Sequence, residues 1–152
     1  MEALRLLAGG HIVFVCYANK NRSPMAAALF AAKMGERGID CRVESAGCAN
    51  YNFRAAEEWS QLEETKMFDL SDHFSRHVSL VSWTKDTLFA CLDEEVRDHM
   101  RSIPNIVFAN LLLVNPPHGV FDPESSHSLP AYRKCFQEIE SGVDQLVAML
   151  VD

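Results

Sequence analysis

The feature that most constrains the fold is the segment spanning residues 11–24. Residues 12–15 form a continuous apolar run rich in β-branched side chains, which is typical of a strand buried on both faces. Cys16 ends this run, Arg22 follows six positions later, and Pro24 begins a stretch with high helix propensity. The pattern predicts a strand, a tight loop and a helix N-terminus.

This arrangement predicts a site for phosphate. Backbone N–H groups that converge at a helix N-terminus bind anions, and a thiol at their rim ionises more readily than a free one. A thiolate is a good nucleophile, and the planar fork of Arg22 can bind two oxygens of a phosphoryl group. We therefore expect Cys16 to lie beneath the phosphorus atom. The alternative is a buried cysteine that ends a core strand beside a surface arginine.

The bulk properties predict one reduced, intracellular domain covering residues 1–152. The chain is 48% hydrophobic, which is enough for a substantial core, and its net charge of −7 argues against binding to nucleic acid or anionic membranes. It shows neither a membrane span nor a secretory signal, so a cytoplasmic location is expected. Five cysteines without Cys-x-x-Cys spacing indicate neither a disulfide framework nor a zinc site.

The apolar pattern along the chain predicts an α/β fold with parallel strands. The expected strands are residues 12–15, 39–44, 86–92 and 106–114, the last being apolar enough to be central or well covered. The expected helices are residues 23–37, 54–67, 93–103 and 129–150. Residues 1–10 are a lead-in of undefined structure.

A long loop, residues 115–127, supplies a candidate acid. Cleaving a phosphate ester requires a proton for the departing oxygen. Asp122 could supply it; this residue follows two apolar residues and precedes Pro123. We expect its carboxyl group to be partly desolvated, which favours the protonated form. His118 and His127 are rival acids on the same loop, and an ordinary Asp-Pro turn is the structural alternative.

Residues 16–24 resemble the phosphate loop of the low-molecular-weight protein tyrosine phosphatases, whose pattern is Cys, five residues, Arg, Ser and usually Pro. Further similar motifs follow in the family's order at residues 44–47, 70–77, 91–95 and 121–123. The resemblance implies a single three-layer domain, with a four-stranded sheet in the order 2-1-3-4 and helices on both faces. It also implies a phosphatase that needs no cofactor or metal.

The resemblance assigns roles to individual residues. It implies a phosphocysteine intermediate on Cys16, with Arg22 holding phosphoryl oxygens and Asp122 acting as general acid and then base. Ser23 would donate a hydrogen bond to the sulfur. The implied substrate is a phosphotyrosine protein or a small aryl phosphate, and the product is inorganic phosphate. The phosphate-binding loop comprises Tyr17, Ala18, Asn19, Lys20, Asn21, Arg22 and Ser23.

Five residues, two of them within the loop itself, are expected to support the loop or line the pocket. Asn19 suits a left-handed backbone, and the resemblance implies that His73 hydrogen-bonds it. Ser45 would hydrogen-bond the loop, or else form an ordinary Ser-Gly turn. Tyr17 and Tyr51 are the expected pocket wall, although Tyr51 could instead pack beneath the next helix.

The loop departs from the family pattern at three positions. Ala18 replaces a usual glycine, which costs strain if that position needs a positive φ. Asn21 replaces a second cysteine, so Cys16 should over-oxidise more readily under peroxide. Lys20 either extends into solvent or attracts an anionic substrate. Glu124 follows Asp122-Pro123 where the family often has aromatic residues, so we expect either a more open pocket or an aromatic side chain supplied by Tyr17 or Tyr51.

The sequence is also compatible with other functions. The loop also resembles that of the phosphoserine phosphatases acting on the RNA polymerase II C-terminal domain, and a phosphoarginine phosphatase would share the fold. Arsenate reductases share it too, but they need two further cysteines on a mobile segment, whereas Cys91 and Cys135 fall on a predicted strand and helix. A catalytically inactive phosphate-binding or interaction module is the alternative of a different class.

Overall fold

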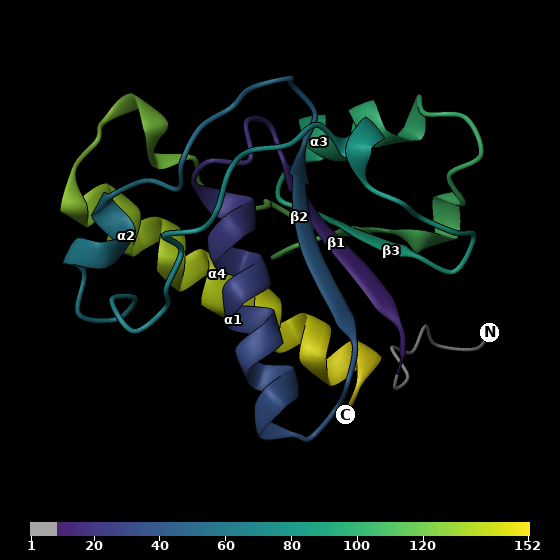
Figure 1. Ribbon diagram of the computed structural model, residues 1–152, viewed down its shortest axis with the longest axis horizontal. Helices are drawn as coiled ribbons and strands as arrows, with labels where there is room; N and C mark the ends of the chain where they lie inside the picture. The colour runs from purple at the N-terminus through teal and green to yellow at the C-terminus, as the bar shows by residue number, and fades with distance from the viewer. Residues whose placement is uncertain (1–8) are drawn as a thin grey trace.

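Four parallel strands form the single sheet on which the described chain is built. The computed structural model describes residues 9–152, so most of the expected lead-in lies outside the described residues (Figure 1). The strands are β1 (His11–Cys16), β2 (Arg42–Gly47), β3 (Leu88–Cys91) and β4 (Leu111–Leu113). Their order in the sheet is β2-β1-β3-β4, which confirms the predicted topology.

Helices cover both faces of this sheet, giving three layers. The α-helices are α1 (Arg22–Glu36), α2 (Glu58–Gln61), α3 (Glu94–Arg101) and α4 (Leu129–Leu150), and short 3-10 turns are η1 (Val78–Leu80), η2 (Phe108–Asn110) and η3 (Pro123–Ser125). The long helices α1 and α4 pack side by side over one face, while α3 and η1 cover the other (Figure 1). Within residues 9–152, no helix is long and apolar enough to cross a bilayer.

Strand β1 is buried on both faces, as its apolar run predicts. Ile12 and Phe14 point into the core beneath α1 and α4, whereas Val13 and Val15 point into the smaller core beneath α3. All four side chains are inaccessible to solvent. Because β1 lies between β2 and β3, both of its backbone edges are also paired. The strand therefore holds Cys16, at its carboxyl end, in a fixed position.

The predicted helix at residues 54–67 is wrong, because only Glu58–Gln61 is helical. The backbone turns extended at Leu62, and the Thr65 hydroxyl donates to the carbonyl of Trp59, which a continuing helix would use for its own ladder. Trp59 and Leu62 are both buried nonetheless. Their helix-like spacing is satisfied by irregular turns packed on the core.

Two predicted strands also differ from the structure. The second lies at Arg42–Gly47 rather than 39–44, because it pairs with β1 up to the register Cys16↔Gly47. The fourth is only Leu111–Leu113, preceded by η2 with Phe108 exposed. It is an edge strand paired with β3 alone, so its apolar run reflects the burial of Leu111 and Leu113, the well-covered alternative, rather than a central position.

Candidate active site

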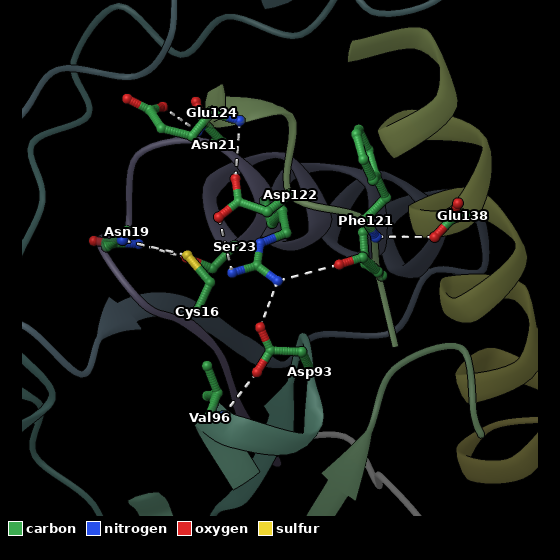
Figure 2. Close-up of polar contacts among 12 residues, drawn as sticks. Cys16, Asn19, Asn21, Ser23, Asp93, Val96, Phe121, Asp122, Glu124 and Glu138 are labelled. Atoms are coloured by element: carbon green, nitrogen blue, oxygen red, sulfur yellow. Dashed lines mark hydrogen bonds and ion pairs between the residues drawn. The ribbon is translucent and has the colours of Figure 1, made fainter. Parts of the chain in front are cut away.

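Cys16 lies where β1 ends and the phosphate loop begins, and its side chain is 3% exposed. The backbone N–H of Asn19 donates to its sulfur at 3.2 Å, and the hydroxyl of Ser23 lies 2.9 Å from it (Figure 2). The loop thus surrounds Cys16 with groups that stabilise negative charge.

Asn19 maintains the curvature of this loop. Its φ of 57° is left-handed, as predicted. The side-chain amide donates to Ser23 at 2.8 Å and to the hydroxyl of Ser45 at 2.9 Å, and its oxygen accepts from the backbone N–H of Arg76. Because Asn19 donates to Ser23, the Ser23 hydroxyl hydrogen is left to point at the sulfur or at the more distant Ala46 carbonyl.

His73 and Ser75 both bind the backbone carbonyl of Asn19. His73 Nε2 donates to it at 2.7 Å, and the Ser75 hydroxyl donates at 3.0 Å. Burial lowers the pKa of His73 and outweighs its bond to Asn19, so the ring is neutral with the proton on Nε2. The structure brings Ser45 and His73 to the loop through Asn19.

Arg22 begins α1 and is almost wholly buried. Its Nη1 donates to Asp93 at 2.7 Å and to the carbonyl of Val120 at 3.1 Å, while Nη2 lies 3.7 Å from Asp122 (Figure 2). Burial opposes its charge, but Cys16 and Asp93 outweigh burial and raise the pKa of Arg22. Protein groups hold Nη1, so the Nε/Nη2 edge is the part of the fork suited to a ligand.

Asp93 is a functional neighbour that sequence reasoning missed. The sequence places it only within the motif at residues 91–95 and at the start of the helix expected over residues 93–103. Its position directly after a strand, at the carboxyl edge of a parallel sheet, is the signal that could have identified it.

Asp122 reaches the same pocket from the loop before α4, but its surroundings differ from the prediction. The side chain is 51% exposed, so the expected desolvation is absent. One carboxylate oxygen accepts from the backbone N–H of Glu124 at 3.0 Å, and the other faces Arg22. The rival acids His118 and His127 are exposed and do not line the pocket.

The site opens into a cavity of about 240 Å³. Aromatic rings tilted against one another form a wall of it, with ring centroids 6.1 Å apart for Tyr17 and Tyr51 and 5.0 Å apart for Tyr51 and Phe53. Phe53 was not predicted to line it. The cavity is lined by Cys16, Tyr17, Ala18, Lys20, Asn21, Arg22, Tyr51, Phe53, Asp122 and Glu124.

The departures from the family loop are accommodated locally. Ala18 does not have a positive φ, so the strain considered for it is absent. Lys20 does not extend freely into solvent; it binds Glu124 at 3.1 Å and lies over the ring of Phe53. Cys91 and Cys135 are buried on β3 and α4, as predicted, and burial raises the pKa of both thiols. They are not on a mobile relay segment.

Comparison with known proteins identifies the family. The sequence model described as low molecular weight phosphotyrosine protein phosphatase matches residues 11–152. The chain belongs to this family. None of the curated proteins compared matches it significantly.

Solved structures agree with this assignment. A low-molecular-weight protein tyrosine phosphatase from T. tengcongensis is 25% identical over 93% of this chain and 100% of its own, with a TM-score of 0.79. YwlE from Bacillus subtilis is 26% identical over 92% and 97%, with a TM-score of 0.77. A YwlE structure described as an arginine phosphatase, at 23% identity over 91% and 93% and a TM-score of 0.75, shows the shared fold. The protein is a cysteine-dependent phosphatase of this family.

Proposed function

We propose that this phosphatase hydrolyses phosphotyrosine in proteins by double displacement. The Cys16 thiolate attacks phosphorus, the bond to the phenolic oxygen breaks, and Asp122 protonates that oxygen. Water then attacks the phosphocysteine, giving its proton to Asp122 and returning the electron pair to sulfur. The products are the tyrosine hydroxyl and inorganic phosphate.

The observation that carries this proposal is the convergence of Cys16, Arg22 and Asp122 on one cavity with an aromatic wall. The buried sulfur lies below, and Asp122 approaches it from a separate loop (Figure 2). Tyr17 and Tyr51 offer flat apolar faces to a phenyl ring. This matches what in-line attack on an aryl phosphate requires.

Each further residue has a role in this mechanism. The Nε/Nη2 edge of Arg22 and the N–H groups of residues 17–23 would hold the phosphoryl oxygens. The Ser23 hydroxyl would stabilise the sulfur as it leaves phosphocysteine, because it lies 2.9 Å away. Asn19, Ser45 and His73 would keep the loop in its binding shape.

The test is turnover by the reduced protein of p-nitrophenyl phosphate and a phosphotyrosine peptide. Cys16→Ser should abolish both activities. Cys41→Ser should retain them, because Cys41 precedes β2 at the end of the sheet opposite to Cys16. Turnover by Cys16→Ser would identify another nucleophile. Absence of turnover in the wild type would instead favour an inactive phosphate-binding module.

Phosphoarginine is the second candidate substrate. Two carboxylates, Asp122 and Glu124, line the cavity and could accept hydrogen bonds from a guanidino group. A protein described as an arginine phosphatase also has this fold. Matched peptides bearing phosphotyrosine, phosphoarginine or phosphoserine-proline separate the candidates by kcat/KM. Because a thiol nucleophile must stay reduced, we propose that the enzyme acts in the cytoplasm.

A further inference from the structure

Glu124 connects two segments that carry different parts of the chemistry. Its Oε2 accepts from the Asn21 side-chain amide at 2.6 Å (Figure 2). Its Oε1 accepts from Lys20 at 3.1 Å. Lys20 and Asn21 belong to the phosphate loop, whereas Glu124 lies on η3, two residues after Asp122. A single carboxylate thus joins the loop that would bind phosphate to the segment that would supply the proton.

The partners of the Asn21 side-chain amide define its orientation. Its oxygen accepts from the hydroxyl of Tyr132 at 2.8 Å, so its two N–H groups lie on the side of Glu124. Asn21 is 7% exposed and Tyr132 is fully buried. Because water has little access to this amide, its bond to Glu124 has no ready replacement.

Lys20 is restrained as well. Its ammonium group lies 5.3 Å from the centre of the Phe53 ring, and its side chain is only 25% exposed. Burial acts to raise the pKa of Glu124, but the bonds from Asn21 and Lys20 outweigh it and leave that pKa below its usual value. The carboxylate is therefore charged at neutral pH, and both contacts are charge-assisted.

Asp122 lies between two anchored neighbours. On one side, the backbone N–H of Phe121 donates to Glu138 of α4 at 2.9 Å, and Lys134 lies over the Phe121 ring. On the other side, the backbone N–H of Glu124 donates to the carboxylate of Asp122 itself. The side chain of Glu124 ties this second neighbour to the phosphate loop, so losing its contacts would free the Glu124 side of Asp122 while the Phe121 anchor stays in place.

We infer that Glu124 is a positioning residue, whose bonds to Lys20 and Asn21 hold Asp122 where it can protonate the leaving oxygen of a substrate bound above Cys16. This rests on the proposed role of Asp122 as the acid. Asn21 and Glu124, two departures from the family pattern, contact each other directly. The chain thus has a polar bond between the phosphate loop and the segment that carries Asp122.

The experiment compares Glu124→Ala with Ser125→Ala, a control on the same turn whose side chain is exposed. The readout is kcat/KM for aryl phosphates whose leaving groups differ in pKa. This constant reports the steps up to and including departure of the leaving group, and not the later hydrolysis of phosphocysteine. General acid catalysis contributes about 10²–10⁴-fold, so misplacing the acid should cost Glu124→Ala about tenfold on phenyl phosphate. With p-nitrophenyl phosphate the loss should stay within about twofold, since that oxygen leaves without a proton. Inhibition by phosphate should not change.

A second comparison tests whether Glu124 acts through Asp122. In an Asp122→Asn background, Glu124→Ala should cause no further loss on phenyl phosphate, because effects exerted through one group are not additive. A loss of equal size on every substrate, or one that persists without Asp122, would mean that Glu124 supports the phosphate loop instead. That result would overturn the inference.

The two proposals fail in different ways. If Asp122→Asn itself shows no dependence on the leaving group, then the proposed acid is wrong. If Asp122→Asn behaves as expected but Glu124→Ala matches Ser125→Ala, only the positioning role is wrong. Glu124→Gln provides the rescue. Its amide oxygen can still accept from Asn21, but the charge pair with Lys20 is lost. The kcat/KM of Glu124→Gln on phenyl phosphate should therefore fall between those of the wild type and Glu124→Ala. A loss in Glu124→Gln as large as in Glu124→Ala would contradict the role of the Asn21 bond.

Discussion

The guanidinium of Arg22 donates to one carboxylate oxygen of Asp93 at 2.7 Å, and the other oxygen caps α3 by accepting from the Val96 N–H at 2.8 Å. Asp93 therefore connects the phosphate loop to a helix on the opposite face of the sheet (Figure 2). This contact determines which edge of the Arg22 fork faces the cavity.

We predict that Asp93→Asn weakens inhibition by phosphate or vanadate. Asparagine retains an oxygen that can cap α3 but loses the charge that holds Nη1, and a charge-assisted bond contributes about 1.5–3 kcal/mol, or roughly tenfold or more in binding. The measurement is the inhibition constant. Asp98→Asn, on the exposed face of α3, is the control. An unchanged constant in Asp93→Asn would show that Arg22 orients itself without this partner.

The Tyr132 hydroxyl is expected to stabilise the fold as well as the loop. Tyr132→Phe leaves the buried oxygen of Asn21 without its donor, which should lower the free energy of unfolding by about 1–3 kcal/mol. Urea denaturation measures this, and Tyr51→Phe, at an exposed ring, should change little. If Tyr132→Phe and Asn21→Ala were fully additive in the double variant, the two groups would not be coupled.

Gly47 allows a close approach between β2 and the phosphate loop. A Cβ at this position would lie 2.9 Å from the Tyr17 carbonyl oxygen and 3.2 Å from Asn19 Cβ. Gly47→Ala should therefore displace the loop, at a cost of about 1–3 kcal/mol, and weaken phosphate binding. Gly35→Ala, in open space on α1, should instead leave binding intact and stabilise the helix. Normal phosphate inhibition in Gly47→Ala would refute the steric argument.

Stability should fall in acid partly because of Glu44. Burial acts to raise its pKa, but hydrogen bonds from Arg76 and His11 outweigh burial and lower it. A lowered pKa adds stability that is fully present above the unfolded value, about pH 4.3, and is lost as the pH falls through the folded value. Glu44→Gln should flatten this part of the curve measured by urea titration at pH 3–6. A curve that keeps the wild-type slope would assign the loss to other groups.

Peroxide should inactivate the enzyme in a way that thiols do not fully reverse. The position that holds a second loop cysteine in many relatives is Asn21, whose amide is bound to Glu124 and Tyr132. Cys16 therefore lacks a neighbouring loop thiol and can proceed to sulfinic acid. Activity after peroxide and then dithiothreitol measures the recovered fraction. Full recovery would show that another thiol protects Cys16.

Local patterns predicted the elements whose signals are strong and contained within one segment. The apolar run before Cys16 identified β1, and the long amphipathic pattern identified α4 with its observed bounds, Leu129–Leu150. The helix expected at residues 54–67 was wrong because spacing shows only which side chains are buried, and here irregular turns, with the Thr65 hydroxyl bonded to the Trp59 carbonyl, bury the same side chains.

The sequence by itself determined the chemistry of the phosphate loop, because a strand, a cysteine, an arginine and a helix start lie within fourteen residues. Only the tertiary structure decided how distant groups complete it. Asp93 and Glu124 lie 71 and 103 positions from their partners Arg22 and Asn21, and no local pattern pairs residues so far apart. The sheet brings them together because its parallel strands end at one edge, where the connecting loops meet.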